Sequence, residues 1–258
     1  MARRVGLAAV QTKLHPRNER GAVEAASSLV TEAASRHATL ICLPEHWLAN
    51  RVVGKRNEIC DYFSKLAMDL GVYLNLGGIY EREVDVYLTS PTFSPDGVMI
   101  SNQRKVHLYR REKKKAKPGS TFTPFRGANF AAGTLVCHDV VFPESARTLA
   151  LSGAEVLLNP SLIVAPGMEP WEVYVTARAL ENRVPLVAPN AVRKALFRGG
   201  SLILTLDYNV KQNVMEVRKE LANDDDEDVI TADVDLDPLV GYRKERFAER
   251  RPDSYYQA

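Results

Sequence analysis

The sequence predicts an α/β protein in which two sheets pack face to face and helices lie outside them. Three observations lead to this fold class. Strand-like apolar runs alternate with helical stretches, the second half of the chain repeats the layout of the first, and antiparallel-looking strands near the C-terminus complete it. We therefore expect a sandwich of two sheets with helices on its outer faces.

The first half of the chain begins with an apolar strand at residues 5–11. The Ala-rich helix that follows, at 19–36, places Val23, Ala26, Val30 and Ala34 on one face. The next expected elements are a strand at 39–43, an amphipathic helix at 58–70, a strand at 73–80 and a strand pair at 86–93 and 98–103. The pair is joined by a turn at 94–97, in which Gly97 suits a position of positive φ.

The second half opens with an apolar run at 130–136 that leads to Cys137. Pro143 then suits the first turn of a helix at 143–151. The order continues with a strand at 155–159, a helix at 170–183, a strand at 186–189 and closing strands at 200–206, 214–218 and 230–234. The acidic run 223–228 is predicted to be a solvated hairpin tip and not a metal site, because the EF-hand pattern is absent.

Length and composition are those of one globular domain that spans residues 1–258. A layered α/β domain of this size buries about three quarters of the surface of its unfolded chain. The hydrophobic fraction of 45% and the charged fraction of 26% are ordinary for a soluble protein. The formal net charge of +2 is too small to indicate a polyanionic partner.

The sequence shows no sign of a membrane segment or an export signal. No apolar run approaches the roughly 18 residues of a membrane span, and the start of the chain lacks a signal-peptide pattern. The three cysteines are odd in number and have no CxxC spacing, which favours a reducing compartment. We therefore expect a cytoplasmic protein with no membrane partner.

Three chemically apt groups stand where predicted strands end. Glu45 follows the strand at 39–43, Lys105 follows the strand at 98–103, and Cys137 ends an apolar run on a sharp connection into a helix. Sites form at strand ends in open α/β architectures, so groups distant in sequence can converge there. A thiol in this place can act as a nucleophile beside free backbone N–H groups.

Each group also has an ordinary structural explanation. Free cysteines are among the most buried residues, so Cys137 can be a core thiol. Glu45 can cap a turn, and Lys105 can belong to a solvated basic run. Cys42, in an apolar strand, and Cys60, in an amphipathic helix, are predicted core residues.

Taken in order, these groups resemble the Glu–Lys–Cys triad of the nitrilase (carbon–nitrogen hydrolase) superfamily. The matching motifs are Leu43-Pro44-Glu45, Arg104-Lys105-Val106-His107-Leu108, and the run from Cys137 through Arg147 to Glu155. The segments 7–11, 177–183 and 251–255 also look like family segments, so the resemblance covers nearly the whole chain. The sequence of the cysteine motif most resembles the corresponding motif of archaeal nitrilase-like proteins.

The resemblance implies a fold and an assembly. The fold would be the four-layer α-β-β-α sandwich, whose helical face pairs with a second subunit in a homodimer or larger homo-oligomer. The C-terminal segment from about residue 236 would pack at that interface. The substrate would be a small molecule, and neither a metal ion nor an organic cofactor would be required.

A further glutamate fits a family spacing. In many members a second glutamate lies six residues before a Pro-Gly pair that follows the lysine motif. Glu112 stands six residues before Pro118 and Gly119, and it is the only acidic residue between Asp96 and Asp139. The resemblance implies that Glu112 orients Lys105 and favours its ammonium form. The alternative is a lone carboxylate solvated among cations.

The triad implies a covalent mechanism. Glu45 would accept the proton of Cys137, since a thiol is a poor nucleophile until it becomes a thiolate. Cys137 would attack an amide carbonyl or nitrile carbon, while Lys105 and the backbone N–H of His138 stabilise the anionic intermediate. The His138 imidazole is not expected to take the thiol proton, because adjacent residues on an extended strand point to opposite faces.

Substrate identity is left open by departures from the family pattern. Gln103 replaces a frequent tyrosine, His138 replaces an aromatic or bulky residue, and residues 190–193 lack a common glycine. These changes leave the triad intact and alter its surroundings. Small aliphatic nitriles or amides are the first candidates, and N-carbamoyl compounds or ω-amides are the alternatives.

Functions of other classes compete with this interpretation. The stretch 104–117 carries eight cations, as expected of a nucleic-acid or anionic-surface binding module, although only Tyr109 interleaves them for stacking. A loop that steers anionic substrates is the other explanation. The GxSxG motif of a serine hydrolase is absent. A zinc site from Cys42, His46, Cys137 and His138 would lack recognisable ligand spacing.

Overall fold

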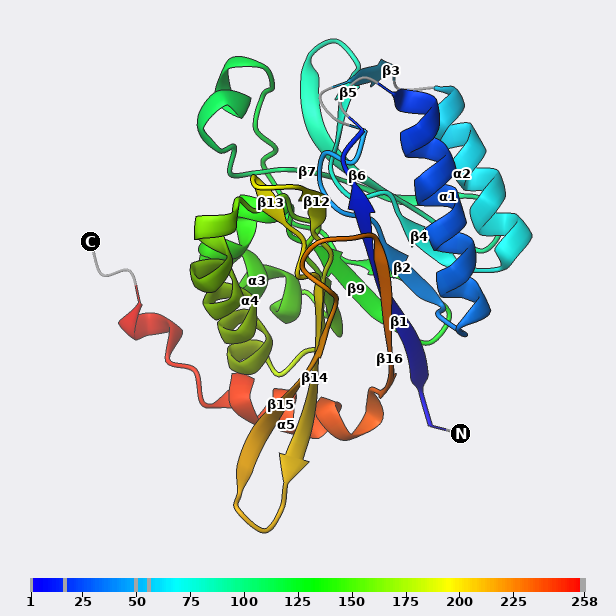
Figure 1. Cartoon of the computed structure of the whole chain (residues 1–258). Coiled ribbons are helices and arrows are strands. Elements are labelled where there is room, and N and C mark those ends of the chain that lie inside the picture. The colour runs from blue at the N-terminus through cyan, green and yellow to red at the C-terminus, as the bar shows by residue number, and fades with distance from the viewer. Residues whose placement is uncertain (1, 16–17, 49–50, 55–56, 256–258) are drawn as a thin grey trace.

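The computed structural model describes residues 2–15, 18–48, 51–54 and 57–255, which form two sheets between two layers of helices (Figure 1). The first sheet has the order β13-β12-β1-β2-β4-β6-β5-β3, and β16 also pairs with β1 and β7 with β6. Its strands are β1 (Arg4–Lys13), β2 (Leu40–Cys42), β3 (Val52–Gly54), β4 (Tyr73–Asn75), β5 (Ile79–Arg82), β6 (Val86–Phe93), β7 (Met99–Arg104), β12 (Ala191–Arg193), β13 (Phe197–Arg198) and β16 (Asp228–Asp235).

The second sheet has the order β15-β14-β11-β10-β9-β8. Its strands are β8 (Phe125–Arg126), β9 (Ala131–Thr134), β10 (Val156–Leu158), β11 (Leu186–Ala188), β14 (Leu202–Asn209) and β15 (Val214–Leu221). The helices are α1 (Glu19–Ser35), α2 (Glu58–Leu70), α3 (Pro143–Leu151), α4 (Met168–Asn182) and α5 (Asp237–Ala248). Short 3-10 helices are η1 (Arg110–Lys114), η2 (Cys137–Val141), η3 (Ala165–Gly167) and η4 (Pro252–Ser254).

The alternation of side chains along β1 shows the order of the layers. Ala8 and Val10 pack in one core cluster with residues of α1 and α2, such as Val30 and Phe63. Leu7, by contrast, packs in a second cluster that contains residues of both sheets. Successive residues of a strand point to opposite faces, so the first sheet has helices on one side and the second sheet on the other.

The outer face of the second sheet is covered in the same way. Leu157 and Leu186 of its strands share a third cluster with Leu149 of α3 and with Trp171 and Val175 of α4. The layers therefore follow the order α-β-β-α, as predicted, with α1 and α2 on one side of Figure 1 and α3 and α4 on the other.

Local signals place several elements where the sequence predicts them. The helix expected at 58–70 is α2, which begins after Asn57, whose side chain accepts the N–H of Cys60 at 2.8 Å. It ends at Gly71, which has the left-handed φ of 66°. The helix expected at 143–151 is α3, with Pro143 in its first turn. Gly97 has a φ of 73° in the turn between β6 and β7, so that prediction is also confirmed.

The single strand expected at 73–80 is wrong, because two strands occupy these residues. β4 pairs with β2, whereas β5 pairs with β3. The chain bends between them at Gly77, which has a φ of 64°, and the Asn75 side chain accepts the Gly77 N–H at 2.9 Å. At the bend the chain changes its parallel strand partner from β2 to β3. The bend itself lies beside Pro44, which follows β2.

The acidic run 223–228 is not a hairpin tip. It joins β15 of the second sheet to β16 of the first sheet, so the chain changes sheets there. The Asn223 side chain accepts the N–H groups of Asp225 and Asp226, and Lys13 forms an ion pair with Asp226. The hairpin lies earlier, between β14 and β15, and projects from the molecule (Figure 1).

Other differences are smaller. The strand expected at 130–136 ends as β9 at Thr134, and β3, β8, β12, β13 and α5 were not expected. α5 packs on its own chain, because Leu239 is buried and Arg243 donates to the Ala154 carbonyl at 3.1 Å. Cys42 and Cys60 are buried in core clusters, as predicted. Within the described residues, the structure contains no helix that is both long and apolar enough to cross a membrane.

Candidate active site

Glu45, Lys105 and Glu112 meet in one buried ion-pair network. Glu45 follows β2, Lys105 follows β7, and Glu112 lies on η1. The Lys105 Nζ atom lies 2.8 Å from Glu45 Oε1 and 2.9 Å from Glu112 Oε1. The Lys105 side chain has no exposed area, and the side chains of Glu45 and Glu112 are 2% and 12% exposed. The lysine is therefore separated from the solvated basic run.

The network keeps Lys105 charged. Burial opposes its ammonium form, but the charges of Glu45 and Glu112 and the hydrogen bond to Glu45 outweigh burial and raise the pKa of Lys105 above its ordinary value. Burial alone would likewise raise the pKa of Glu112. The nearby His46 ring, the Lys105 ammonium and the Tyr109 N–H overcome it, so the pKa of Glu112 lies below its usual range.

A glycine pair makes room for Glu45. A Cβ atom on Gly78 would lie 2.5 Å from Glu45 Cγ, and one on Gly77 would lie 2.0 Å from the Pro44 carbonyl oxygen. The Glu45 N–H also donates to the Ser161 carbonyl at 3.2 Å, which ties this loop to the second sheet. Within the described part of the chain, Glu45 Oε1 binds Lys105, and Oε2 is left without a hydrogen bond.

Cys137 begins η2 in a left-handed conformation, with a φ of 45°. Its N–H donates to the Pro160 carbonyl at 2.9 Å. Burial and the charge of Glu45 raise the pKa of the Cys137 thiol well above its usual value, although Lys105 and the Leu162 N–H lower it in part. The resting thiol is therefore neutral and needs a base before it can act as a nucleophile.

The segment 159–162, which follows β10 of the second sheet, contacts both the Cys137 segment and the Glu45 loop of the first sheet. The Asn159 side chain donates to the Leu135 carbonyl at 2.6 Å and to the Cys137 carbonyl at 3.2 Å, and the Leu162 N–H lowers the pKa of the Cys137 thiol. Ser161 accepts the Glu45 N–H. Sequence patterns do not point to these residues, because a strand followed by Asn-Pro-Ser is typical of an ordinary turn.

Among the described residues the backbone N–H of His138 is free, and its imidazole packs between aromatic rings. In the described ranges no acceptor binds its N–H, although the N–H groups on either side of it, of Cys137 and Asp139, are both occupied. The imidazole packs against Tyr109 and Phe142 with ring centroids 4.9 and 5.4 Å apart. The extended-strand reason given for the imidazole does not apply, because Cys137 begins η2. The role of the imidazole stays a prediction.

Asp139 links the segment after Lys105 to the segment around Cys137. It is fully buried, and its Oδ1 accepts the His107 N–H at 2.8 Å and contacts His107 Nδ1 at 2.9 Å. Its Oδ2 accepts the Val136 N–H at 3.0 Å. Arg178 of α4 holds the other end of η2, because it donates to the carbonyls of Val140 and Val141 at 2.9 Å each. The motif residues around Cys137 thus fix its place relative to Lys105.

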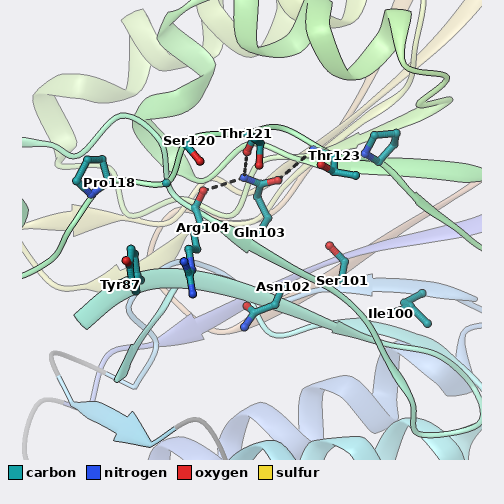
Figure 2. A pocket seen from close by; sticks show the side chains of 12 residues that line it. Tyr87, Ile100, Ser101, Asn102, Gln103, Arg104, Pro118, Ser120, Thr121 and Thr123 are labelled. Carbon is teal, nitrogen blue, oxygen red and sulfur yellow. Dashed lines mark hydrogen bonds between the residues drawn. The ribbon is translucent and has the colours of Figure 1, made fainter. Parts of the chain in front are cut away.

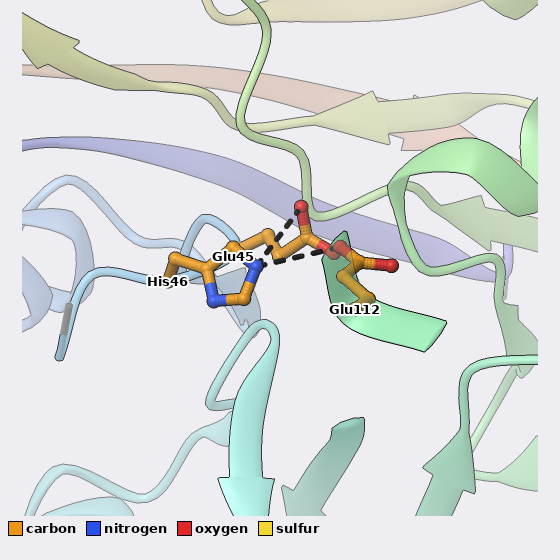
Figure 3. A group of neighbouring side chains, drawn as sticks. All are labelled: Glu45, His46 and Glu112. Carbon is orange, nitrogen blue, oxygen red and sulfur yellow. Dashed lines mark ion pairs between the residues drawn. The ribbon is translucent and has the colours of Figure 1, made fainter. Parts of the chain in front are cut away.

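The described residues contain one group of side chains that could together ligate a metal ion, namely Glu45, His46 and Glu112 (Figure 3). Their ligand atoms lie within 4.8 Å of one another. The Lys105 ammonium already binds both of these carboxylates. A metal ion would therefore be repelled by a buried cation that has the same partners. This group contains none of the cysteines weighed for a zinc site.

A separate groove runs along β7 (Figure 2). Its volume is about 470 Å³, and Asn102, Arg104, Ser120 and Thr121 are among the residues that line it. Gln103 donates to the Thr121 carbonyl at 2.7 Å, so the wall of the groove is already hydrogen-bonded. None of Glu45, Lys105 or Cys137 lines the groove.

The basic stretch 104–117 is partly engaged by the protein itself. Arg104 pairs with Glu83 at 2.9 Å and stacks on Tyr87. Lys117 pairs with Asp85 at 2.7 Å, and the Lys115 ammonium lies 3.7 Å from the centroid of the Tyr80 ring. The exposed cations with no role in these contacts are Arg110, Arg111, Lys113 and Lys114.

The four layers, with acidic, basic and thiol groups gathered at the strand ends, are typical of an α/β enzyme. The chain belongs to the carbon–nitrogen hydrolase family, whose model matches residues 6–244. It is therefore a carbon–nitrogen hydrolase, of the kind that includes nitrilases and amidases.

Individual relatives agree with this assignment. A protein named nitrilase from Pyrococcus abyssi is 32% identical over 90% of this chain and 92% of its own length. A protein named N-carbamoylputrescine amidase from Oryza sativa subsp. japonica is 30% identical over 98% of this chain and 93% of its own length. The crystal structure of a carbon–nitrogen hydrolase from Helicobacter pylori G27 superposes with a TM-score of 0.84. It covers 98% of this chain and 97% of that chain at 23% identity, and so supports the fold.

Proposed function

We propose that this enzyme hydrolyses small aliphatic amides or nitriles through a covalent intermediate on Cys137 and releases ammonia. One observation carries the proposal. A fully buried Lys105 binds both Glu45 and Glu112, and this network lies within electrostatic reach of a strand-end thiol. A buried charged network with every member paired is expensive to build for stability alone, which favours a role in chemistry.

In the proposed first half-reaction, Glu45 Oε2 takes the thiol proton as the Cys137 sulfur attacks the amide carbon. The carbonyl oxygen becomes negative, and Lys105 and the free His138 N–H stabilise it. Such donors are worth on the order of 3 kcal/mol each in other enzymes. Protonated Glu45 then gives its proton to the nitrogen as the C–N bond breaks, so ammonia leaves and a thioester remains.

In the second half-reaction, Glu45 removes a proton from water as the water oxygen attacks the thioester carbon. The C–S bond breaks, and the proton held by Glu45 returns to the sulfur. The products are a carboxylic acid and ammonia, and the enzyme is regenerated. A nitrile would follow the same route through a thioimidate and one more water molecule.

The names of two relatives support these substrate classes, since one is a nitrilase and the other an amidase of an N-carbamoyl compound. N-carbamoyl compounds and ω-amides are therefore the second candidates, because the same catalytic groups would serve them. The chain's departures from the family motifs lie around the pocket, so they bear on substrate choice and not on the chemistry.

An ammonia-release screen over small amides, nitriles, ω-amides and N-carbamoyl compounds tests the proposal. Substituting Cys137→Ala should abolish release while the protein stays folded, and Cys60→Ala is the matched control with full activity. Iodoacetamide should label Cys137 before Cys42 or Cys60, which are core residues. Wild-type turnover that survives Cys137→Ala would contradict the cysteine mechanism.

A further inference from the structure

His46 lies against both carboxylates of the network. Its Nε2 atom is 3.5 Å from Glu112 Oε1 and 3.9 Å from Glu45 Oε2, and its side chain is 12% exposed (Figure 3). The backbone at His46 is left-handed, with a φ of 59°, and its N–H donates to the Gly78 carbonyl at 2.7 Å. Non-glycine residues are uncommon in this conformation, so the surrounding structure enforces the backbone turn at His46.

The other ring nitrogen indicates the protonation state. His46 Nδ1 is buried, and no described residue is hydrogen-bonded to it. A proton on Nδ1 would place an unpaired N–H in the interior, which is unfavourable. The neutral ring with its proton on Nε2 avoids this and points a donor at Glu112. The 3.5 Å separation is long, as catalytic hydrogen bonds often are before substrate binds.

Neighbouring groups hold the ring in this orientation. The Tyr80 ring of β5 lies 5.1 Å from the imidazole, and the Lys115 ammonium lies on the Tyr80 ring. The charged groups that face His46 are Glu45 on its own loop, Glu112 on η1 and Lys105 after β7.

We propose that His46 is a positioning residue that donates its Nε2–H to Glu112 and thereby holds Lys105 away from Glu45 Oε2. With this bond, Glu112 has three donors, since Lys105 and His46 bind Oε1 and the Tyr109 N–H binds Oε2 at 2.7 Å. A fixed Glu112 keeps the Lys105 ammonium shared between two carboxylates. Without a fixed Glu112, Lys105 would bind Glu45 alone, and Glu45 would then be a weaker base.

This inference rests on the proposed function, and a pair of variants tests it. In His46→Gln, the side-chain amide N–H can replace Nε2–H. In His46→Asn, the amide is too short to reach Glu112, although asparagine suits the left-handed backbone better. We expect kcat to fall at least about tenfold in His46→Asn with KM nearly unchanged, and to recover to within about threefold of wild type in His46→Gln.

Two measurements need no substrate. The rate at which iodoacetamide alkylates Cys137 at pH 7 should fall in His46→Asn and recover in His46→Gln. In the wild-type protein, ¹⁵N spectra at pH 7 should show one of the five histidines as a neutral Nε2–H tautomer that is missing from the His46→Gln spectrum. This second measurement reads the His46 ring directly and does not depend on turnover.

Wild-type kcat and alkylation in His46→Asn would overturn the inference, because the turn alone would then explain His46. A folded His46→Gln protein that remains as slow as His46→Asn would also overturn it, as would an Nδ1–H tautomer or an imidazolium at pH 7. Failure of the proposed function has a different signature, namely a wild-type enzyme that releases no ammonia from any compound while the alkylation pattern holds.

Discussion

Lys105 carries a charge that is fully buried beneath the surface of the protein. Removing a charge from water costs several kcal/mol unless its partners replace the lost hydration. Here two carboxylates do so within 2.9 Å, and backbone strain lies close by. The non-glycine residues with positive φ include His46 after β2, Arg110 at the start of η1 and Cys137 at the start of η2. Strain of this kind persists where the surrounding structure enforces it.

Removing the charge of Glu112 should slow the reaction. Glu112→Gln keeps the size of the side chain but leaves the Lys105 ammonium with one carboxylate, so it is held less firmly beside Cys137. We expect kcat to fall at least about tenfold, roughly 1.4 kcal/mol of barrier, in a steady-state ammonia assay. Glu24→Gln, on α1 with its side chain 64% exposed, is the matched control and should keep wild-type kcat.

Lys105→Arg tests the same network by changing its cation instead of its carboxylate. A planar guanidinium cannot replace a compact ammonium in a fully enclosed space, so this variant should also lose activity. An unchanged kcat in Glu112→Gln would remove only the auxiliary role of Glu112. The proposed roles of Glu45, Lys105 and Cys137 would stand.

The pKa shifts predict how stability changes with pH. The pKa of Glu112 is lowered from its ordinary 4.5, so its contribution is complete above about pH 4.5 and is lost as pH falls through the lower folded value. The pKa of Lys105 is raised, so its contribution is complete below 10.5 and is lost only as pH rises above that. Both contributions are therefore constant between pH 6 and 9.

Urea unfolding of wild type and Glu112→Gln at pH 7 and pH 3 checks this expectation. The difference in free energy of unfolding between the two proteins should be largest at pH 7 and smaller at pH 3. An equal difference at both pH values would show that Glu112 keeps its ordinary pKa in the folded protein.

At the scale of elements, the connection between β4 and β5 decides where Glu45 lies. Gly78→Ala would place a methyl group 2.5 Å from Glu45 Cγ and push that side chain away from Lys105. We expect kcat to fall at least about tenfold with a small change in melting temperature. Gly241→Ala is the control, because a Cβ atom there meets nothing within 4 Å. Because Gly241 lies in α5, Gly241→Ala should preserve activity and raise the free energy of unfolding by up to about 1 kcal/mol.

This connection also shows what the sequence can predict. The helices α2 and α3 follow from their caps and apolar spacing, which are local signals. Glu45, Lys105 and Cys137 could be predicted because each belongs to a recognisable motif at a strand end. The split of 73–80 could not, because the change of strand partners at Gly77 depends on residues distant in sequence. The same holds for Asn159 and Leu162, whose roles arise only when the two sheets meet.

The η1 loop should steer small anions and not bind polyanions. Its exposed cations Arg111, Lys113 and Lys114 lie on both sides of Glu112, so their field reaches the site. We expect no submicromolar affinity for DNA or RNA at physiological salt. For an amide that carries an acid group, kcat/KM should fall with rising salt, and changing all three cations to glutamine should remove this dependence. Tight, salt-sensitive nucleic-acid binding would contradict this expectation.

On the scale of the whole molecule, the site exists only because the two sheets pack together. Glu45 and Lys105 come from loops of the first sheet, whereas Cys137 and Leu162 come from loops of the second. The core between the sheets, which includes Leu7 and Ile203, therefore sets the distance between Glu45 and Cys137. Loosening this core should impair catalysis before it unfolds the protein.

The outer face formed by α3 and α4 predicts how the whole chain assembles. Leu151, Val173 and Leu180 leave 44%, 63% and 36% of their surface exposed there. Beside them lies a hollow of about 550 Å³ lined in part by Arg147, whose Nη1 atom is buried without a partner among the described residues. A second copy on this face would cover the apolar groups and could supply the missing acceptor.

We therefore expect a homodimer through α3 and α4, with the C-terminal segment at the interface. Light scattering should give at least twice the 28.7 kDa of one chain. Val173→Glu would bury a charge in this interface and should yield monomers, whereas Val84→Glu, on a residue that is 92% exposed between β5 and β6, should not. Deleting residues 249–258 should weaken the dimer and leave α5 in place. A full-length monomer at tens of micromolar would contradict this assembly, and Arg147 would then need a partner from elsewhere.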